Sequence, residues 1–154
     1  GFTAFCHDYP GSCAASPSAQ RQVALDARRL SELREVNARV NDAIWPAKDR
    51  NEDVWSIAPE AGDCDDYAVT KRDMLIRMGY APSALLLTTA RTERGEKHLV
   101  LVVSTDQGDL ILDNRTDEVR DWRDVRYTWE TRQSSINPKI WQTVTGPASV
   151  ASVR

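Results

Sequence analysis

Three short apolar runs that follow one another after Pro82 restrict the fold more than any other feature of this sequence. They occupy residues 84–90, 99–103 and 110–112, and turn-forming residues separate them. Strand-sized runs joined by short turns predict an antiparallel meander. The run 99–103 is apolar at every position. It therefore predicts a central strand covered by helices on one face and by loops or chain on the other.

Two stretches before the meander have helical periodicity. Through residues 18–46, apolar side chains recur at spacings of three and four, and Pro46 ends the pattern, which predicts a long amphipathic helix. A second helix is predicted from Asp63 as its N-cap, with Asp66 as capping-box partner, to Gly79 as its C-terminal stop. Helices packed on an antiparallel sheet define an α+β fold.

The length of 154 residues suits one domain with a substantial core. Residues 1–17 are rich in Pro, Gly and Ser without periodicity and predict an irregular N-terminal arm. The domain itself is expected at 18–145, and residues 146–154 are expected to form a flexible tail.

The segments around the meander are less regular. Residues 113–124 are charged and turn-like, whereas the aromatic segments 126–132 and 139–144 predict one or two further strands. Residues 46–62 read as a connecting loop that carries Trp55 toward the second helix. Trp55 could line a site, or it could simply anchor the loop to the core.

Charge and hydropathy exclude two classes of function. The 20 Lys and Arg residues are scattered against 23 Asp and Glu, for a net charge of −3. No basic stripe for nucleic acid is predicted. No apolar run approaches the roughly 20 residues that a membrane span requires, so the chain is predicted to be a soluble domain without a membrane span.

Two of the three cysteines lie seven residues apart in the N-terminal arm. A disulfide between Cys6 and Cys13 would stabilise the fold by about 2.5 kcal/mol on the chain-entropy model and would imply an oxidising compartment. The alternatives are two reduced cysteines in a flexible arm, or an incomplete metal site that includes His7. Cys64 is then the odd cysteine, and a leftover thiol requires an explanation.

Cys64 is a candidate nucleophile. It falls at the first position of the second helix, where free backbone N–H groups and the positive end of the helix dipole favour a thiolate. His98, the only histidine outside the arm, stands where a turn enters the central strand and suits a general base. Asp113 closes the third strand and could orient His98.

The pairing of the two strands decides whether the histidine and the aspartate can meet. If residues 105–108 form a four-residue loop, Ser104 pairs with Asp109, and Asp113 becomes a same-face diagonal neighbour of His98. A slip of two residues would place them directly opposite, and a slip of one would place them on opposite faces. The hairpin therefore favours the His–Asp pair.

Asp63, Asp65 and Asp66 crowd the sulfur of Cys64. One carboxylate about 6 Å away opposes the thiolate by roughly 3 kcal/mol, or about two pKa units, at an effective dielectric of 20. Either these carboxylates point into solvent as helix caps, or a hard cation such as calcium binds them and reverses the local field. The chemistry itself requires no cofactor.

These residues resemble a known family. The pattern Gly-Asp-Cys-Asp-Asp-Tyr at 62–67, the run His-Leu-Val-Leu at 98–101 and Leu-Asp-Asn at 112–114 are similar to the bacterial transglutaminase-like cysteine proteinases. The resemblance implies a papain-like, transglutaminase-like α+β core and a Cys64, His98, Asp113 triad. In adhesin-processing members, acidic residues beside the cysteine take part in calcium binding, which implicates Asp63 and Asp65. Those members often have Glu where this chain has Asp65.

The resemblance also suggests a function and a compartment. The arm with Cys6 and Cys13 is similar to that of exported relatives, which favours a periplasmic or secreted protein. The expected activity is that of a thiol-dependent endopeptidase on a protein or peptide substrate, for which a surface adhesin is one candidate. Transglutaminase or amidase-type acyl transfer would use the same triad, and a non-catalytic binding domain could retain the same fold.

Overall fold

The central feature of the computed structural model, which describes residues 1–16, 20–48 and 53–144, is a six-stranded antiparallel sheet. Its strands lie in the order β6-β5-β4-β3-β7-β8. Strands β3, β4 and β5 form the predicted meander, β6 adds a strand at its edge, and β7 and β8 extend the sheet beyond β3. The bounds are β3 Leu85–Arg91, β4 Lys97–Thr105, β5 Gly108–Asp113, β6 Thr116–Asp121, β7 Thr128–Gln133 and β8 Trp141–Thr143.

The hairpin between β4 and β5 has the predicted register. Ser104 pairs with Asp109, and the pairing continues to Leu101 and Leu112. The turn is shorter than predicted, because Thr105 and Gly108 also pair and only two residues remain at the tip. Gly108 has a φ of 111°, a conformation that glycine adopts without steric cost. The His98 end of β4 and the Asp113 end of β5 therefore lie side by side.

The prediction that residues 113–124 are only turn-like was wrong. They contain the edge strand β6 and the short 3-10 helix η3, Trp122–Asp124. The sequence of β6, TDEVRD, lacks an apolar alternation because most of its side chains are half-buried or exposed. Charged residues are common on edge strands, where they discourage pairing with other chains.

The first long helix is shorter than predicted. Helix α2 spans Ala27–Ala43, and its N-cap Asp26 accepts a hydrogen bond of 2.7 Å from the Arg29 N–H. Val23, which fitted the helical periodicity, instead bridges to Thr105, and its N–H donates to the Ser104 carbonyl at 2.8 Å. Val23 is buried beside the sheet, and this burial extended the apolar pattern past the true helix start.

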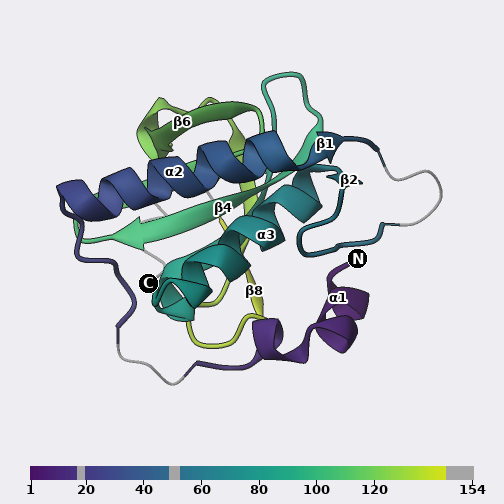
Figure 1. Cartoon of the computed structure of the whole chain (residues 1–154), viewed down its shortest axis with the longest axis horizontal. Coiled ribbons are helices and arrows are strands. Elements are labelled where there is room, and N and C mark those ends of the chain that lie inside the picture. The colour runs from purple at the N-terminus through teal and green to yellow at the C-terminus, as the bar shows by residue number, and fades with distance from the viewer. Residues whose placement is uncertain (17–19, 49–52, 145–154) are drawn as a thin grey trace.

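Helices α2 and α3, the latter spanning Cys64–Arg77, lie together across one face of the sheet (Figure 1). One buried cluster fills the space between them and the sheet and includes Leu33, Val40, Leu75, Leu99 and Leu101. Each such side chain contributes about 1.5–3 kcal/mol by leaving water. The α+β class with the cysteine-bearing helix on an antiparallel sheet is confirmed.

The opposite face of the sheet is also covered. Val100, Val102, Ile111 and Trp129 form a second buried cluster there, with Tyr127 packed against it. Because side chains alternate along a strand, β4 sends Leu99 and Leu101 to the helices and Val100 and Val102 to this second cluster. The central strand is thus buried on both faces, as its uninterrupted apolar sequence predicted.

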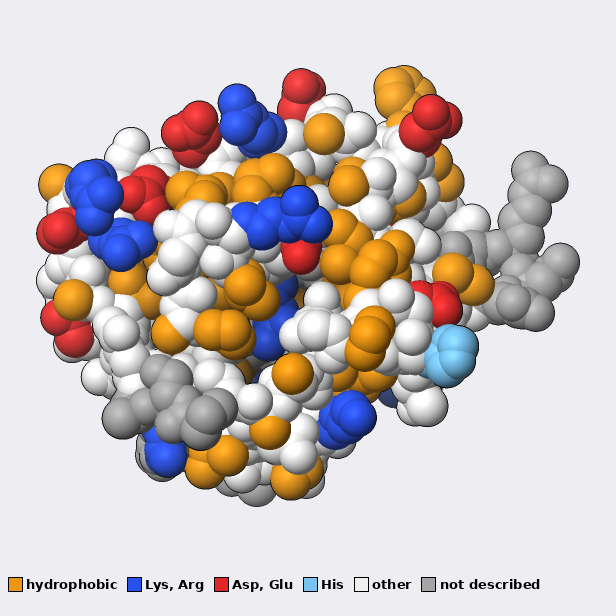
Figure 2. Space-filling view, turned by 60° about the horizontal axis from the view of Figure 1, so that its bottom comes forward, with side chains coloured by type: hydrophobic (Ala, Val, Ile, Leu, Met, Phe, Trp, Pro, Cys, Tyr) orange, Lys and Arg blue, Asp and Glu red, His pale blue; other side chains and the backbone are white. Residues whose placement is uncertain are grey.

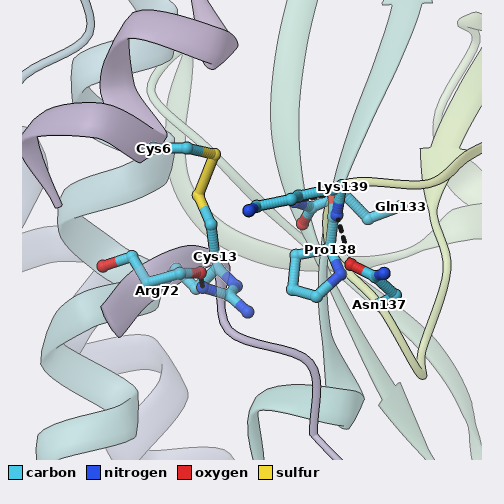
Figure 3. Close-up of a disulfide and its surroundings, with 8 residues drawn as sticks. Cys6, Cys13, Arg72, Gln133, Asn137, Pro138 and Lys139 are labelled. Carbon is cyan, nitrogen blue, oxygen red and sulfur yellow. Dashed lines mark hydrogen bonds between the residues drawn. A yellow bond between two sulfur atoms is a disulfide. The ribbon is translucent and has the colours of Figure 1, made fainter. Parts of the chain in front are cut away.

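The N-terminal arm was predicted to be irregular, and this was wrong. It contains helix α1, Phe2–Asp8, and the 3-10 helix η1, Pro10–Cys13. The sulfurs of Cys6 and Cys13 are bonded across this short loop (Figure 3). Aromatic packing holds the arm in this structure, because Phe2 and Phe5 pack against Trp55 with centroid distances of 5.5 and 6.2 Å. This long-range packing is not visible in the local sequence pattern.

The arm is fastened to helix α3 beneath the disulfide. The buried guanidinium of Arg72 donates from Nη1 to the Ser12 carbonyl at 2.8 Å and from Nε to the Leu85 carbonyl at 2.9 Å. Arg72 lies beside the Cys6–Cys13 bond in Figure 3. One side chain therefore ties the arm, the cysteine-bearing helix and the sheet together.

The predicted tail, residues 146–154, lies outside the described residues, and the domain limits 18–145 stay a prediction.

The remaining elements are short. Strands β1, Trp45–Pro46, and β2, Ala61–Gly62, pair in parallel just before α3, and the 3-10 helix η2, Pro82–Ala84, leads into β3. Among the helices of the described residues, none is long and apolar enough to cross a membrane. On the face shown in Figure 2, Lys and Arg side chains are interspersed with Asp and Glu.

Candidate active site

The start of helix α3 is built by its own acidic residues. Asp63 is the N-cap, and Asp66 completes a capping box by accepting from the Asp63 N–H at 2.9 Å. The other oxygen of Asp66 accepts from the Ser56 N–H at 2.7 Å and so ties the preceding loop to the helix. This network fixes the first turn of the helix, where Cys64 lies half-buried.

Gly62 allows this turn to close. A Cβ added at Gly62 would lie 2.7 Å from Cβ of Asp66, a contact that real side chains do not make. The Gly62–Asp63 sequence is therefore required by the packing of the capping box against the backbone before it. The predicted capping box is confirmed. The sequence around Cys64 is thus restricted by the steric need for glycine at Gly62 as well as by the electrostatics of the helix start.

The structure brings His98 and Asp113 into direct contact. Nε2 of His98 lies 2.7 Å from Oδ1 of Asp113, and the two residues are 8% and 6% exposed. Because an ionised carboxylate only accepts, Nε2 carries the proton of this bond. Within the described residues, Nδ1 of His98 makes no hydrogen bond, so it remains available as a base.

Asp113 is held in its ionised form by several donors. Burial disfavours its charge, but the hydrogen bond and charge of His98 outweigh burial, helped by Tyr127 and by the Arg115 backbone N–H. Together they hold the pKa of Asp113 below its usual range. A charged Asp113 accepts from Nε2 over the whole neutral range and stabilises the imidazolium form of His98.

Cys64 approaches the same strand from the helix side. The backbone N–H of Leu99, the residue after His98, approaches the sulfur of Cys64 and acts to lower its pKa. Helix α3 also packs on β4. The helix start and the strand therefore place the thiol beside the residue that follows the histidine.

The environment of the sulfur opposes the thiolate. Burial is the largest cause, the Asp65 carboxylate is the next, and together with Asp63 they raise the pKa of Cys64 to about 12 despite the approach of the Leu99 N–H. Sγ lies 3.8 Å from Oδ1 of Asp65. The sequence indicated the conflict with the carboxylates but not the larger effect of burial. At neutral pH the thiol is protonated, so a base must remove its proton during attack.

An acidic cluster surrounds this thiol. Ligand atoms of Asp63, Cys64 and Asp65 all lie within 4.8 Å of one another. Burial, a hydrogen bond to Asp53 and the nearby carboxylates raise the pKa of Asp65 to about 8. The raised pKa means that burial and the neighbouring carboxylates disfavour the charged form of Asp65. Oxygen ligands in this arrangement fit a hard cation such as calcium.

Asp53 was missed by sequence reasoning. It lies ten residues before Asp63 in a polar loop, and no motif or spacing in that loop marks it. Trp55, by contrast, was predicted to line the site or to anchor the loop. Its indole donates to Asp53 at 2.9 Å, and its ring is only 9% exposed among Phe2 and Phe5. Trp55 therefore joins the N-terminal arm to the acidic cluster.

Two further residues contact the His–Asp pair and were not predicted as site residues. The hydroxyl of Tyr127 donates to Oδ2 of Asp113 at 2.5 Å, and the guanidinium of Arg115 donates to that hydroxyl at 3.0 Å. Tyr127 follows Asp113 by fourteen residues and directly precedes β7. In the sheet, β7 is separated from β5 by the two strands β4 and β3. No local pattern connects it to His98, although its aromatic ring predicted a strand position.

A free cysteine at a helix N-terminus, packed on a sheet beside a buried His–Asp pair, is the arrangement of a cysteine peptidase. The family model described as bacterial transglutaminase-like cysteine proteinase BTLCP matches residues 1–149. The chain belongs to this family of cysteine peptidases. A search of the curated proteins found no match to the sequence.

Solved structures show the same fold. Legionella pneumophila LapG superposes with a TM-score of 0.64 at 20% identity, over 78% of this chain and 71% of that chain. The calcium-bound form of LapG gives a TM-score of 0.61 at 19% identity, over 80% of each chain. An EGTA-treated form gives 0.64 at 20% identity, over 75% of this chain and 67% of that chain. At this identity, the likeness concerns the fold.

Proposed function

We propose that this cysteine peptidase is an endopeptidase that cleaves a protein substrate through a Cys64, His98, Asp113 triad. The observation that carries the proposal is the 2.7 Å bond between Nε2 of His98 and Asp113, on the strand whose next N–H contacts the Cys64 sulfur. This bond leaves Nδ1 of His98 as the nitrogen that can take the thiol proton.

The proposed reaction follows the usual order for a thiol nucleophile. His98 removes the proton of Cys64 as the sulfur attacks the peptide carbonyl, and Asp113 stabilises the imidazolium that forms. The negative charge on the carbonyl oxygen develops near the backbone N–H of Cys64 at the first turn of α3. His98 then protonates the leaving amine, and a water molecule hydrolyses the thioester to release the acid and regenerate the thiol.

We place the protein in the periplasm or outside the cell. The disulfide between Cys6 and Cys13 supports this compartment, because such bonds persist where the environment is oxidising. The resemblance to adhesin-processing proteases supports a surface adhesin as the substrate. Acyl transfer to an amine differs only in the second nucleophile and would appear as a cross-linked product in place of a new carboxyl terminus.

The test is cleavage of the cell's own surface proteins by the purified chain, with Cys64→Ala as the matched control and with new termini mapped by mass spectrometry. We expect new amino termini with the native chain and none with the variant. Equal termini in both samples, or none in either together with ordinary alkylation of Cys64, would argue for a non-catalytic binding domain.

Calcium is proposed to bind the acidic cluster of Asp53, Asp63 and Asp65. The proximity of these carboxylates and the raised pKa of Asp65 support this, because a divalent cation would supply the positive charge that the cluster lacks. The existence of a calcium-bound structure of LapG is consistent with it. When bound, the ion would offset the carboxylates that oppose the Cys64 thiolate.

Millimolar calcium is expected to raise the melting temperature of the chain in a thermal shift assay. Binding at 100 times Kd stabilises the folded state by about 2.7 kcal/mol. In Asp65→Ala the calcium-dependent rise should disappear, even if the variant without calcium is itself more stable because repulsion is relieved. Excess EGTA must return the native chain to its starting value. An equal rise in the native chain and in the variant would contradict this site.

A further inference from the structure

The His98–Asp113 pair continues into a chain of polar contacts that reaches the surface. Tyr127 donates to Oδ2 of Asp113 at 2.5 Å, and Arg115 donates from Nη1 to the same hydroxyl at 3.0 Å. Glu93 in turn accepts from both terminal nitrogens of Arg115, at 3.0 and 3.4 Å. Each member is thus fixed by the one further from the active site.

Tyr127 is also packed against the residues that it serves. Its ring meets the His98 ring edge to face, with centroids 5.5 Å apart and planes at 84°. The Arg115 guanidinium lies over the Tyr127 ring, 5.6 Å from its centroid. Trp129 contacts it at 5.8 Å on the second buried cluster. The ring position is therefore set by packing, and only the hydroxyl is directed at Asp113.

The hydrogen bonds to its two oxygens fix the orientation of the Asp113 carboxylate. Oδ1 accepts from His98 and from the Arg115 backbone N–H at 3.1 Å, while Oδ2 accepts from Tyr127. Rotation of the carboxylate would break bonds at both oxygens at once. With Tyr127 in place, Oδ1 remains directed at Nε2 of His98, and the ring keeps Nδ1 free.

We propose that Tyr127 is a positioning residue for the peptidase, which holds Asp113 through its hydroxyl and is itself held by Arg115 and Glu93. The inference rests on the proposed function, since it assigns His98 as the base. Tyr127 acts on the reaction only through Asp113, and it does not touch the reacting sulfur. Burial and the Asp113 carboxylate raise the pKa of Tyr127, so the hydroxyl stays a donor at every working pH.

The kinetic test is Tyr127→Phe, which keeps the ring and removes the hydroxyl. We expect kcat for peptide cleavage to fall about tenfold with little change in KM, because Asp113 loses a hydrogen bond that holds it and the alignment of the base affects the chemical step. A cavity of about 470 Å³ borders Asp113 and Tyr127, so water can partly replace the hydroxyl and limit the loss.

Tyr80→Phe is the matched control. The Tyr80 hydroxyl donates to Glu32 at 2.8 Å, and Arg29 lies 4.5 Å over its ring, which reproduces the same Arg–Tyr–carboxylate chemistry away from His98. This variant should retain native kcat. A double variant separates positioning from packing: in an Asp113→Ala background, Tyr127→Phe should cause no further loss. A tenfold loss in both backgrounds would overturn the proposal.

A second measurement needs neither a substrate nor a successful variant. The chain has two histidines, and exposed His7 serves as an internal reference in a ¹⁵N spectrum of the neutral imidazoles. In the native chain His98 should be protonated at Nε2 alone, and in Tyr127→Phe the two nitrogen shifts should move toward each other. A native His98 protonated at Nδ1, or unchanged shifts in the variant, would overturn the proposal. If no substrate is ever cleaved but these shifts behave as expected, the proposed function fails and the positioning role stands.

Discussion

His98→Ala is expected to lower the rate of peptide cleavage by roughly 10³-fold, within the range that a positioned general base contributes. The thiol of Cys64 is protonated at neutral pH, because burial and the neighbouring carboxylates raise its pKa to about 12. Its proton must therefore be taken as the sulfur attacks. His98 lies on β4 directly before Leu99, whose N–H approaches the Cys64 sulfur, and its side chain has Asp113 as a carboxylate partner.

The measurement is kcat on a mapped substrate peptide, with iodoacetamide alkylation of Cys64 as a second readout. His7→Ala is the matched control, since His7 is a histidine whose side chain is 90% exposed in the N-terminal arm. It should keep native rates in both assays. If His98→Ala cleaves and alkylates at the native rate and its melting temperature is unchanged, the base must be a different group and the triad is incorrect.

The parts of this site that could be predicted from sequence are those encoded by neighbours in the chain. Asp63 and Asp66 form the capping box because their spacing matches the first turn of a helix, and Cys64 is placed by it. The meeting of His98 and Asp113 follows from a hairpin whose register is set by a short turn. Both inferences need only local geometry and the period of a strand.

The residues that sequence reasoning missed are brought in by long-range packing. Tyr127 reaches Asp113 from the segment before β7, which joins the sheet next to β3 and not next to β5. Asp53 reaches Asp65 from an irregular loop. No pairing rule within a meander could have indicated either contact, because both depend on how the second half of the sheet and the loop close over the first.

The errors in the fold have the same origin. The edge strand β6 is charged because one of its edges faces solvent, so it lacks the pattern of a covered strand. The N-terminal arm is helical because Phe2 and Phe5 pack against Trp55, which lies some fifty residues further along the chain. In both segments tertiary context decides the structure, and local propensity is only a weak guide.

Lys71 is expected to have a large effect on the free energy of unfolding, which can be measured without an activity assay. Its side chain is fully buried on α3, and within the described residues its ammonium group has no hydrogen-bond partner, although it lies 5.8 Å from the Tyr67 ring centroid. Burial, opposed by the charges of Asp113 and Asp117, lowers the pKa of Lys71 to about 7 from an unperturbed 10.5. The native chain therefore releases this proton several pH units before the unfolded chain does.

The sign of the pH dependence follows from this difference. Between pH 7 and 10.5 the unfolded chain holds a proton on Lys71 that the native chain lacks, so this residue makes the free energy of unfolding rise with pH. Below pH 7 both states are protonated, and the native state carries the full cost of a buried charge. From pH 7 to 9.5 the rise should approach roughly 3 kcal/mol, at 1.36 kcal/mol per unit.

Lys71→Met removes the titration and keeps most of the side-chain volume. We expect the variant to be more stable than the native chain at pH 6.5, and we expect this advantage to shrink by roughly 3 kcal/mol by pH 9.5, where native Lys71 is neutral. Urea unfolding at several pH values, in constant EGTA, measures the difference in the free energy of unfolding between the variant and the native chain. The titration of the acidic cluster is common to both chains and cancels in this difference. Lys139→Met, at an exposed lysine, should show no such trend. A stability difference that stays constant with pH would mean that Lys71 keeps an ordinary pKa, and its charge would then have to be balanced by Asp113, in competition with His98.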